Sequence, residues 1–127
     1  MFKKVCVCAV LGAVVAAFCM PSASALPPFN KEWKAKYAEG NSNAKFVEAV
    51  EMEKCNVCHK GMNKKDRNDY GQTVAKFLTK KKYNEIKDDE AAAKKYIIDG
   101  LKSAEAEKSK NGKTYGELIK AGQLPGN

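Results

Sequence analysis

The stretch EKCNVCHKGM, residues 53–62, contains two cysteines with two residues between them and a histidine directly after the second cysteine. His59 is the single histidine of the 127-residue chain. Residues three positions apart are neighbours on a helical turn, so Cys55 and Cys58 can face the same side. The stretch therefore brings two thiols and one imidazole together within one turn.

The pattern Cys-x-x-Cys-His is typical of the covalent attachment of haem c. Thiols at this spacing can reach two vinyl groups on one edge of the porphyrin and form a thioether with each. The next residue, His59, can then bind the iron from the proximal side. The sequence predicts one haem c, with Cys55 and Cys58 as its attachment points and His59 as an axial iron ligand.

Two other kinds of site use the same residue types. Structural zinc needs four protein ligands, and this stretch supplies at most three. A thioredoxin-type dithiol needs only Cys55 and Cys58, but it usually lies in a βαβ setting, of which the sequence gives no sign. A small structural disulfide between the same cysteines is a further alternative to haem c.

The first 25 residues have the pattern of a secretory signal peptide. Two lysines precede an apolar run at residues 5–20, and Ala23-Ser24-Ala25 forms an Ala-x-Ala cleavage site. The run is shorter than the about 20 residues that a membrane-spanning helix needs. We expect cleavage after Ala25, export to the periplasm or an equivalent compartment, no stable membrane insertion afterwards, and one mature domain at residues 26–127.

Cleavage changes both the cysteine count and the charge. Three of the five cysteines lie in the leader, so a scaffold with several disulfides is excluded. Two of the 23 basic residues also leave, and 21 basic against 15 acidic residues give a net charge of +6. Export argues against nucleic acid as the partner. We expect an acidic redox partner, with Lys60, Lys64 and Lys65 near the motif as docking candidates.

Hydrophobic periodicity and capping residues predict an all-α fold with four to five short helices. Pro27 and Pro28 are expected as an extended lead-in to a helix at residues 31–39 that Asn30 caps. Further helices are expected from residue 44 into the cysteine motif, at residues 70–78, after Asp88 or Asp89, and at residues 115–121. The helix after Asp88 or Asp89 is expected to bury the face formed by Ala93, Ile97, Leu101 and Ala104. The segment 26–43 forms an N-terminal helical extension, and Lys80-Lys81-Lys82 is expected as a solvated helix end.

Two helix starts share one pattern, with a capping residue, Tyr, Gly and then Gln or Glu, at residues 69–72 and 114–117. The pattern predicts a capping box at each start. The two tyrosines, Tyr70 and Tyr115, are expected either in the core or against a flat ligand.

The segments EKCNVCHKGMNKKDRNDYGQTVAKFL, residues 53–78, and GKTYGELIKAGQLPG, residues 112–126, resemble small monohaem c-type cytochromes of planctomycete and anammox bacteria. The resemblance covers most of residues 44–127. It implies a cytochrome c-like domain around one covalent haem, and a one-electron carrier rather than an enzyme. Some of these cytochromes form heterodimers in which a cysteine is the second axial ligand. No third cysteine follows residue 25 here, so that ligand is not carried over, and a hetero- or homodimer stays open.

The second axial ligand is not determined by the sequence. No methionine follows Met62, although a downstream methionine is the usual ligand in cytochromes c. Met62, Met52, Tyr115 or a lysine of the C-terminal half are candidates, and an open site is the alternative that we favour. An open site would suit a binder of a small gas such as nitric oxide or carbon monoxide. A haem subunit of a larger redox complex is a third possibility.

Overall fold

The computed structural model describes residues 26–61 and 65–126. Over these residues the chain forms six α-helices, one 3₁₀ turn and no β-strand, which confirms the all-α class. The elements in chain order are α1 (Pro27–Tyr37), α2 (Ala44–Glu53), η1 (Lys54–Val57), α3 (Asp69–Phe77), α4 (Lys80–Ile86), α5 (Glu90–Ala106) and α6 (Tyr115–Lys120). The expected signal peptide, Met62 and Lys64 lie outside the described residues.

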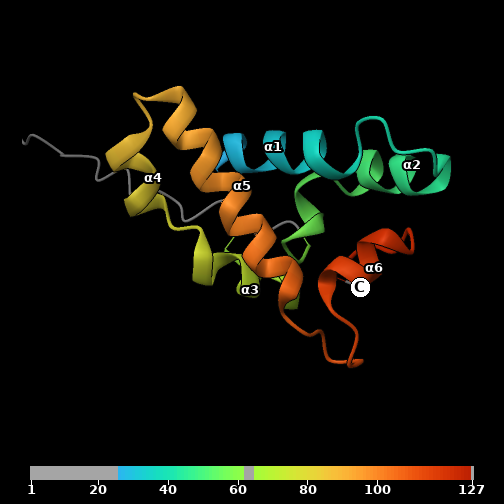
Figure 1. Ribbon diagram of the computed structural model, residues 1–127. Helices are drawn as coiled ribbons and strands as arrows, with labels where there is room; N and C mark the ends of the chain where they lie inside the picture. The colour runs from blue at the N-terminus through green and yellow to red at the C-terminus, as the bar shows by residue number, and fades with distance from the viewer. Residues whose placement is uncertain (1–25, 62–64, 127) are drawn as a thin grey trace, which may run out of the picture.

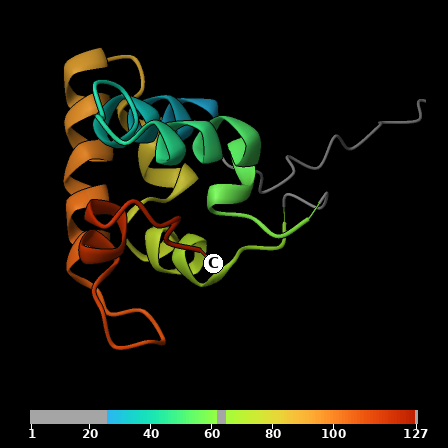
Figure 2. The same cartoon turned by 90° about the vertical axis from the view of Figure 1, so that its right-hand side faces the viewer.

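Helix α5 is the scaffold on which the other helices pack. It contacts α1, α3, α4 and α6; it runs diagonally across the view in Figure 1 and along one side of the molecule in Figure 2. The face expected from the sequence is buried: Ala93, Ile97, Leu101 and Ala104. Gly100 is buried beside them, and a Cβ there would lie 2.3 Å from Leu78 Cδ2. The glycine therefore allows α5 to pack closely against the end of α3.

The starts of α1 and α4 differ from the expectation. Helix α1 begins at Pro27 rather than after Asn30, because proline suits the first helical turn, where its missing N–H costs no bond. The three lysines at 80–82 do not end a helix but begin α4, whose N-cap is Thr79. The Thr79 hydroxyl accepts from the Lys82 N–H at 3.3 Å. This extra helix raises the number of α-helices above the four to five expected.

An aromatic cluster joins the helices in the core. The Trp33 Nε1–H donates to the Tyr70 hydroxyl at 2.9 Å, and both side chains are buried. Tyr70 also packs against Tyr115, with 5.1 Å between the ring centroids. Trp33 packs against Phe46 and Tyr37 on its other sides. The two tyrosines of the repeated pattern therefore pack on each other, and α1 contributes its tryptophan to the common core.

The described helices contain no segment that combines the length and the apolar character needed to cross a membrane.

A hydrogen-bonded cluster fastens α1 to the C-terminal part of α5. The Tyr37 hydroxyl donates to Glu105 Oε1, and Lys36 Nζ lies 2.9 Å from the same oxygen. Burial raises the pKa of Glu105, but the hydrogen bonds from Tyr37 and Lys36 outweigh it, so that the pKa is lowered. A lowered carboxylate pKa stabilises the fold above the ordinary glutamate value, and this stabilisation is lost as the pH falls through the folded-state value.

Replacing Tyr37 by phenylalanine should lower the free energy of unfolding at pH 7 by about 1 kcal/mol, because one hydrogen bond to a carboxylate is lost. The variant should also lose less stability than the parent when the pH falls below about 4.3. Thermal unfolding between pH 7 and pH 3 measures both effects. Tyr83→Phe, which removes a hydroxyl from another half-buried tyrosine, is the matched control. Equal pH profiles for parent and Tyr37→Phe would contradict this role of Glu105.

Candidate functional site

The cysteine motif forms a tight turn at the end of α2. Lys54, the C-cap of α2, has a φ of 49°, which is uncommon for a residue with a Cβ, and it redirects the chain. The backbone N–H groups of Cys58 and His59 then both donate to the Cys55 carbonyl, at 3.2 Å and 3.1 Å. One helix was predicted to run from residue 44 into the motif. In the structure, α2 is followed by the short 3₁₀ turn η1, with a sharp change of direction between them.

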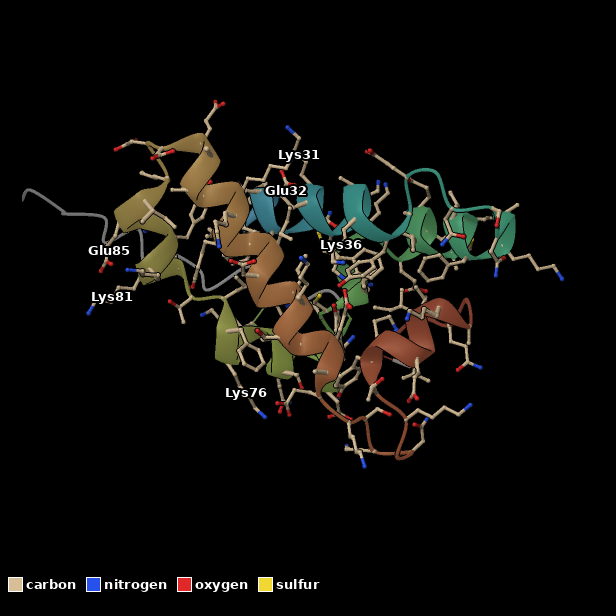
Figure 3. The ribbon with its side chains drawn as sticks, viewed as in Figure 1. Lys31, Glu32, Lys36, Lys76, Lys81 and Glu85 are labelled. Carbon is tan, nitrogen blue, oxygen red and sulfur yellow. The ribbon has the colours of Figure 1, made fainter. Side chains whose placement is uncertain are left out.

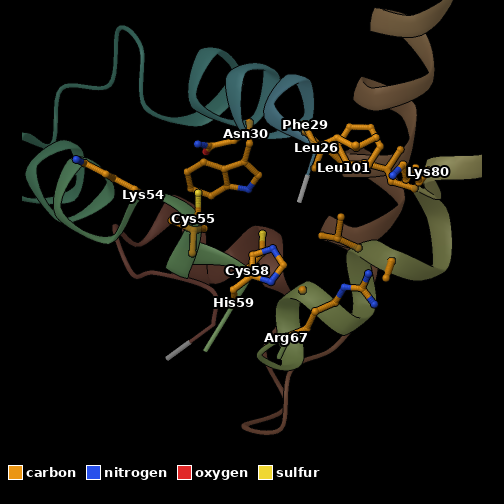
Figure 4. Close-up of a pocket in the computed structure, with 16 residues that line it drawn as sticks. Leu26, Phe29, Asn30, Lys54, Cys55, Cys58, His59, Arg67, Lys80 and Leu101 are labelled. Atoms are coloured by element: carbon orange, nitrogen blue, oxygen red, sulfur yellow. The ribbon is translucent and has the colours of Figure 1, made fainter. Parts of the chain in front are cut away.

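The three residues of the Cys-x-x-Cys-His motif, Cys55, Cys58 and His59, line one cavity. Figure 4 shows Cys55, Cys58 and His59 at one side of this space, with Leu26 and Phe29 at another. The space among the lining side chains is about 830 Å³, including the part open to solvent. The part of this space that can hold water-sized molecules is about 130 Å³. The cavity walls come from the start of α1, the motif, α3, α4 and α5: Leu26, Phe29, Asn30, Trp33, Lys54, Cys55, Val57, Cys58, His59, Arg67, Gly71, Val74, Ala75, Leu78, Lys80 and Leu101.

Several lining residues had no signal in the sequence. Asn30 was expected as a helix cap, and Lys80 as part of a solvated helix end. Both now contribute to the cavity, together with Arg67. Their positions depend on how α1, α3 and α4 pack around the motif, and neither periodicity nor capping chemistry reveals that.

The electrostatic setting of Cys58 is that of a neutral thiol. Cys55 and Cys58 are both free cysteines in this structure. Burial raises the pKa of the Cys58 thiol to about 12, and the neighbouring Cys55 adds to the rise. Reactive dithiols instead have a lowered pKa, often at a helix N-terminus. The motif follows the C-terminal end of α2, where the helix dipole disfavours a thiolate. This setting argues against a thioredoxin-type dithiol.

The donor set fits a prosthetic group that brings its own iron ligands. No group of three or more His, Cys, Asp and Glu side chains that could hold a metal ion occurs in residues 26–61 and 65–126. Instead, one buried imidazole and two thiols share a cavity with mostly apolar walls. Haem c requires this combination, because the porphyrin supplies four ligands and the thiols react with its vinyl groups.

The other candidate iron ligands lie in different places. Met52 is 76% exposed on α2. Tyr115 is 3% exposed, packs on Tyr70, and is not among the residues that line the cavity. Two lysines do line it: Lys54, next to Cys55, and Lys80, at the start of α4. Of the lysines in the C-terminal half, Lys80 is therefore the candidate that the fold brings to the site.

Comparison of the chain with protein-family models, with curated proteins and with solved structures finds no match. The functional argument therefore depends on the residues of the site and on their arrangement.

Helix α3 packs directly against the motif turn. The Asn68 N–H donates to the Cys58 carbonyl at 3.0 Å, and the Lys60 N–H donates to the Asp66 carbonyl at 2.8 Å. In the first turn of α3, a Cβ at Gly71 would lie 1.9 Å from the Cys58 carbonyl oxygen. Only glycine allows this approach, which brings Val74 and Leu78 of the same helix segment to the cavity.

Replacing Gly71 by alanine should lower the free energy of unfolding by roughly 1–3 kcal/mol, as overpacking in a core does. The clash is with backbone, so no side-chain rotation can relieve it. Gly116→Ala is the matched control, because Gly116 also follows a tyrosine in the first turn of a helix. A Cβ at Gly116 would lie 3.3 Å from its nearest neighbours, so this change should cost less. Chemical denaturation of both variants tests this, and equal costs would contradict the close packing at Cys58.

Proposed function

We propose that this chain is an exported c-type cytochrome that carries single electrons through one covalently bound haem. One observation carries the proposal: Cys55, Cys58 and His59 line a single, mainly apolar cavity in a small all-α fold. The haem c attachment pattern is a feature of local spacing, and the cavity is a feature of how the helices pack around it. Their coincidence favours haem over a zinc site, a dithiol or a disulfide.

Each protein group has a defined part in holding the haem. The two thiols would each add across a vinyl double bond, with sulfur joining one carbon and hydrogen the other, so no oxidant is consumed. His59 would be the axial ligand. The haem would supply the one-electron redox chemistry. The chain itself contributes apolar walls that limit the access of water, and no acid–base step is required of it.

Basic side chains suit both the cofactor and a partner. Lys54, Arg67 and Lys80 line the cavity and are exposed at its edge, where they can pair with the carboxylates of a haem. Lys76 of α3 and Lys81 of α4 are also exposed, and their side chains extend away from the fold (Figure 3). A net charge of +6 after cleavage favours an acidic redox partner and an association rate that falls with rising salt.

The test of the proposal is expression of the full chain in a host that exports proteins and attaches haem c. The product should have the intact mass of residues 26–127 plus one haem, and the haem should resist acid–acetone extraction. The single tryptophan, Trp33, lines the cavity, so its fluorescence should be quenched in the loaded protein. Replacing both Cys55 and Cys58 by alanine should abolish attachment.

Replacement of the leader cysteines, Cys6 and Cys8, by alanine is the matched control and should leave attachment unchanged. Extractable haem, or an intact mass without haem, would refute the cytochrome proposal.

A second candidate function is the binding of a small gas at the iron. The observation that favours it is that, in the part of the chain that the structure describes, the cavity is lined by neither a methionine nor a second histidine. A haem held by His59 alone on the protein side would leave one axial position for an external ligand. This candidate shares the attachment residues with the carrier and differs in the second axial ligand.

Titration of the reduced protein with carbon monoxide tests whether the second axial position is open, as gas binding requires. We expect at least partly high-spin ferrous haem that binds carbon monoxide readily. Met62→Ala and Lys80→Gln should then change little, and Tyr115→Phe is a control for a residue away from the cavity. A low-spin, unreactive parent that becomes reactive in one variant would contradict the open site and identify that residue as the ligand.

A further inference from the structure

Asn68 joins α3 to the motif turn through both ends of its side chain. Its Nδ2 group donates to the Val57 carbonyl at 2.9 Å and to the Asn56 carbonyl at 3.3 Å. Its Oδ1 accepts from the Gly71 N–H at 2.8 Å. With its backbone bond to the Cys58 carbonyl, this one residue makes three hydrogen bonds to the motif turn. The sequence pattern predicted Asp69 as the N-cap of this helix, but the N-cap is Asn68.

Capping alone does not require the amide group. An N-cap needs only an acceptor for an N–H of the first turn, and the hydroxyls of Thr79 and Thr114 and the carboxylate of Asp89 supply one here. The Nδ2 group of Asn68 has a different role. The carbonyls of Asn56 and Val57 lie in the last turn of the α2–η1 segment, where helical carbonyls lack partners within the helix. The amide satisfies them.

The surroundings of Asn68 leave little room for rearrangement. The residue is 4% exposed. A Cβ at Gly126 would lie 2.0 Å from Asn68 Nδ2, so the C-terminal segment closes over the amide from another side. On the other side, Gly71 lies so close to the Cys58 carbonyl that no side chain would fit between them. A buried amide with satisfied donors and acceptor in a tightly packed place fixes the orientation of the backbone that it contacts.

We propose that Asn68 is a positioning residue whose amide holds the turn from Cys55 to His59 so that both thiols and the imidazole face the cavity. This inference rests on the proposed function, because the placement of the thiols matters for attaching haem. The amide acts through its hydrogen bonds to the carbonyls of Asn56 and Val57, the two residues between the cysteines. Asn68 therefore sets the relative placement of the two thiols as well as the start of α3.

Asn68→Ser separates the two roles of the residue. Serine is about as good an N-cap as asparagine, but it cannot reach both carbonyls as the amide does. In the protein as purified, hydrogen exchange of the Cys58 and His59 amides should become roughly tenfold faster for each stabilising bond lost. A share of the chains should also carry haem through one thioether only. The pyridine haemochrome spectrum reports this, because its α band moves to longer wavelength when one vinyl group remains.

Asn43→Ser is the matched control. Asn43 is the N-cap of α2, where its Oδ1 accepts from the Phe46 N–H at 3.2 Å, and it is exposed. The same substitution there should leave exchange at Cys58 and the haemochrome band unchanged. If Asn68→Ser and Asn43→Ser behave alike, Asn68 is an ordinary cap and the proposal is overturned.

A measurement on the unmodified protein remains decisive if Asn68→Ser does not fold. The side-chain amide protons of Asn68 should exchange slowly in NMR spectra, whereas those of Asn43 should exchange fast. Fast exchange at Asn68 would overturn the proposal. If the unmodified protein carries no covalent haem, the proposed function fails, and hydrogen exchange at Cys58 still decides whether Asn68 holds the turn.

Discussion

The arrangement of this molecule depends on the close contact between the Cys58 carbonyl and the first turn of α3. The carbonyl accepts a hydrogen bond from the Asn68 N–H, and Gly71 faces it without a side chain. A turn that carries two thiols and an imidazole is short and has little apolar surface of its own. Its shape must therefore come from a neighbour, and here α3 provides it through backbone and amide hydrogen bonds.

The rest of the fold supports this contact. Helix α5 packs against α3, and α1 packs against α5, so the cavity is enclosed by elements that share one support. The aromatic cluster of Trp33, Tyr70 and Tyr115 continues this packing, and Trp33 belongs to both the cluster and the cavity wall. A domain of about 100 residues has a modest core. An apolar prosthetic group in the cavity would add buried surface at the point where the helices converge.

Apolar side chains line the inside of the cavity, and charged side chains lie at its edge or outside it. The apolar walls and the protonated Cys58 thiol lie inside the cavity, while Lys54, Arg67 and Lys80 are exposed at its edge. Near the C-terminal end of α5, Glu105 receives hydrogen bonds from Tyr37 and Lys36 and fastens α1. The basic residues near the cavity can thus pair with carboxylates of a cofactor or a partner, whereas Glu105 stabilises the packing of α1 on α5.

The sequence by itself determined the features that depend on near neighbours in the chain. These features depend on residues three or four positions apart, which the helical repeat brings together. They are the spacing of Cys55, Cys58 and His59, the buried face of α5 and the capping box of Thr114. The tertiary structure decided which side chains meet across the cavity, that Asn68 rather than Asp69 caps α3, and that Lys80 begins a helix at the cavity edge. The Trp33–Tyr70 hydrogen bond joins residues 37 positions apart. Such contacts depend on how whole helices pack, which local hydrogen bonding and periodicity do not specify.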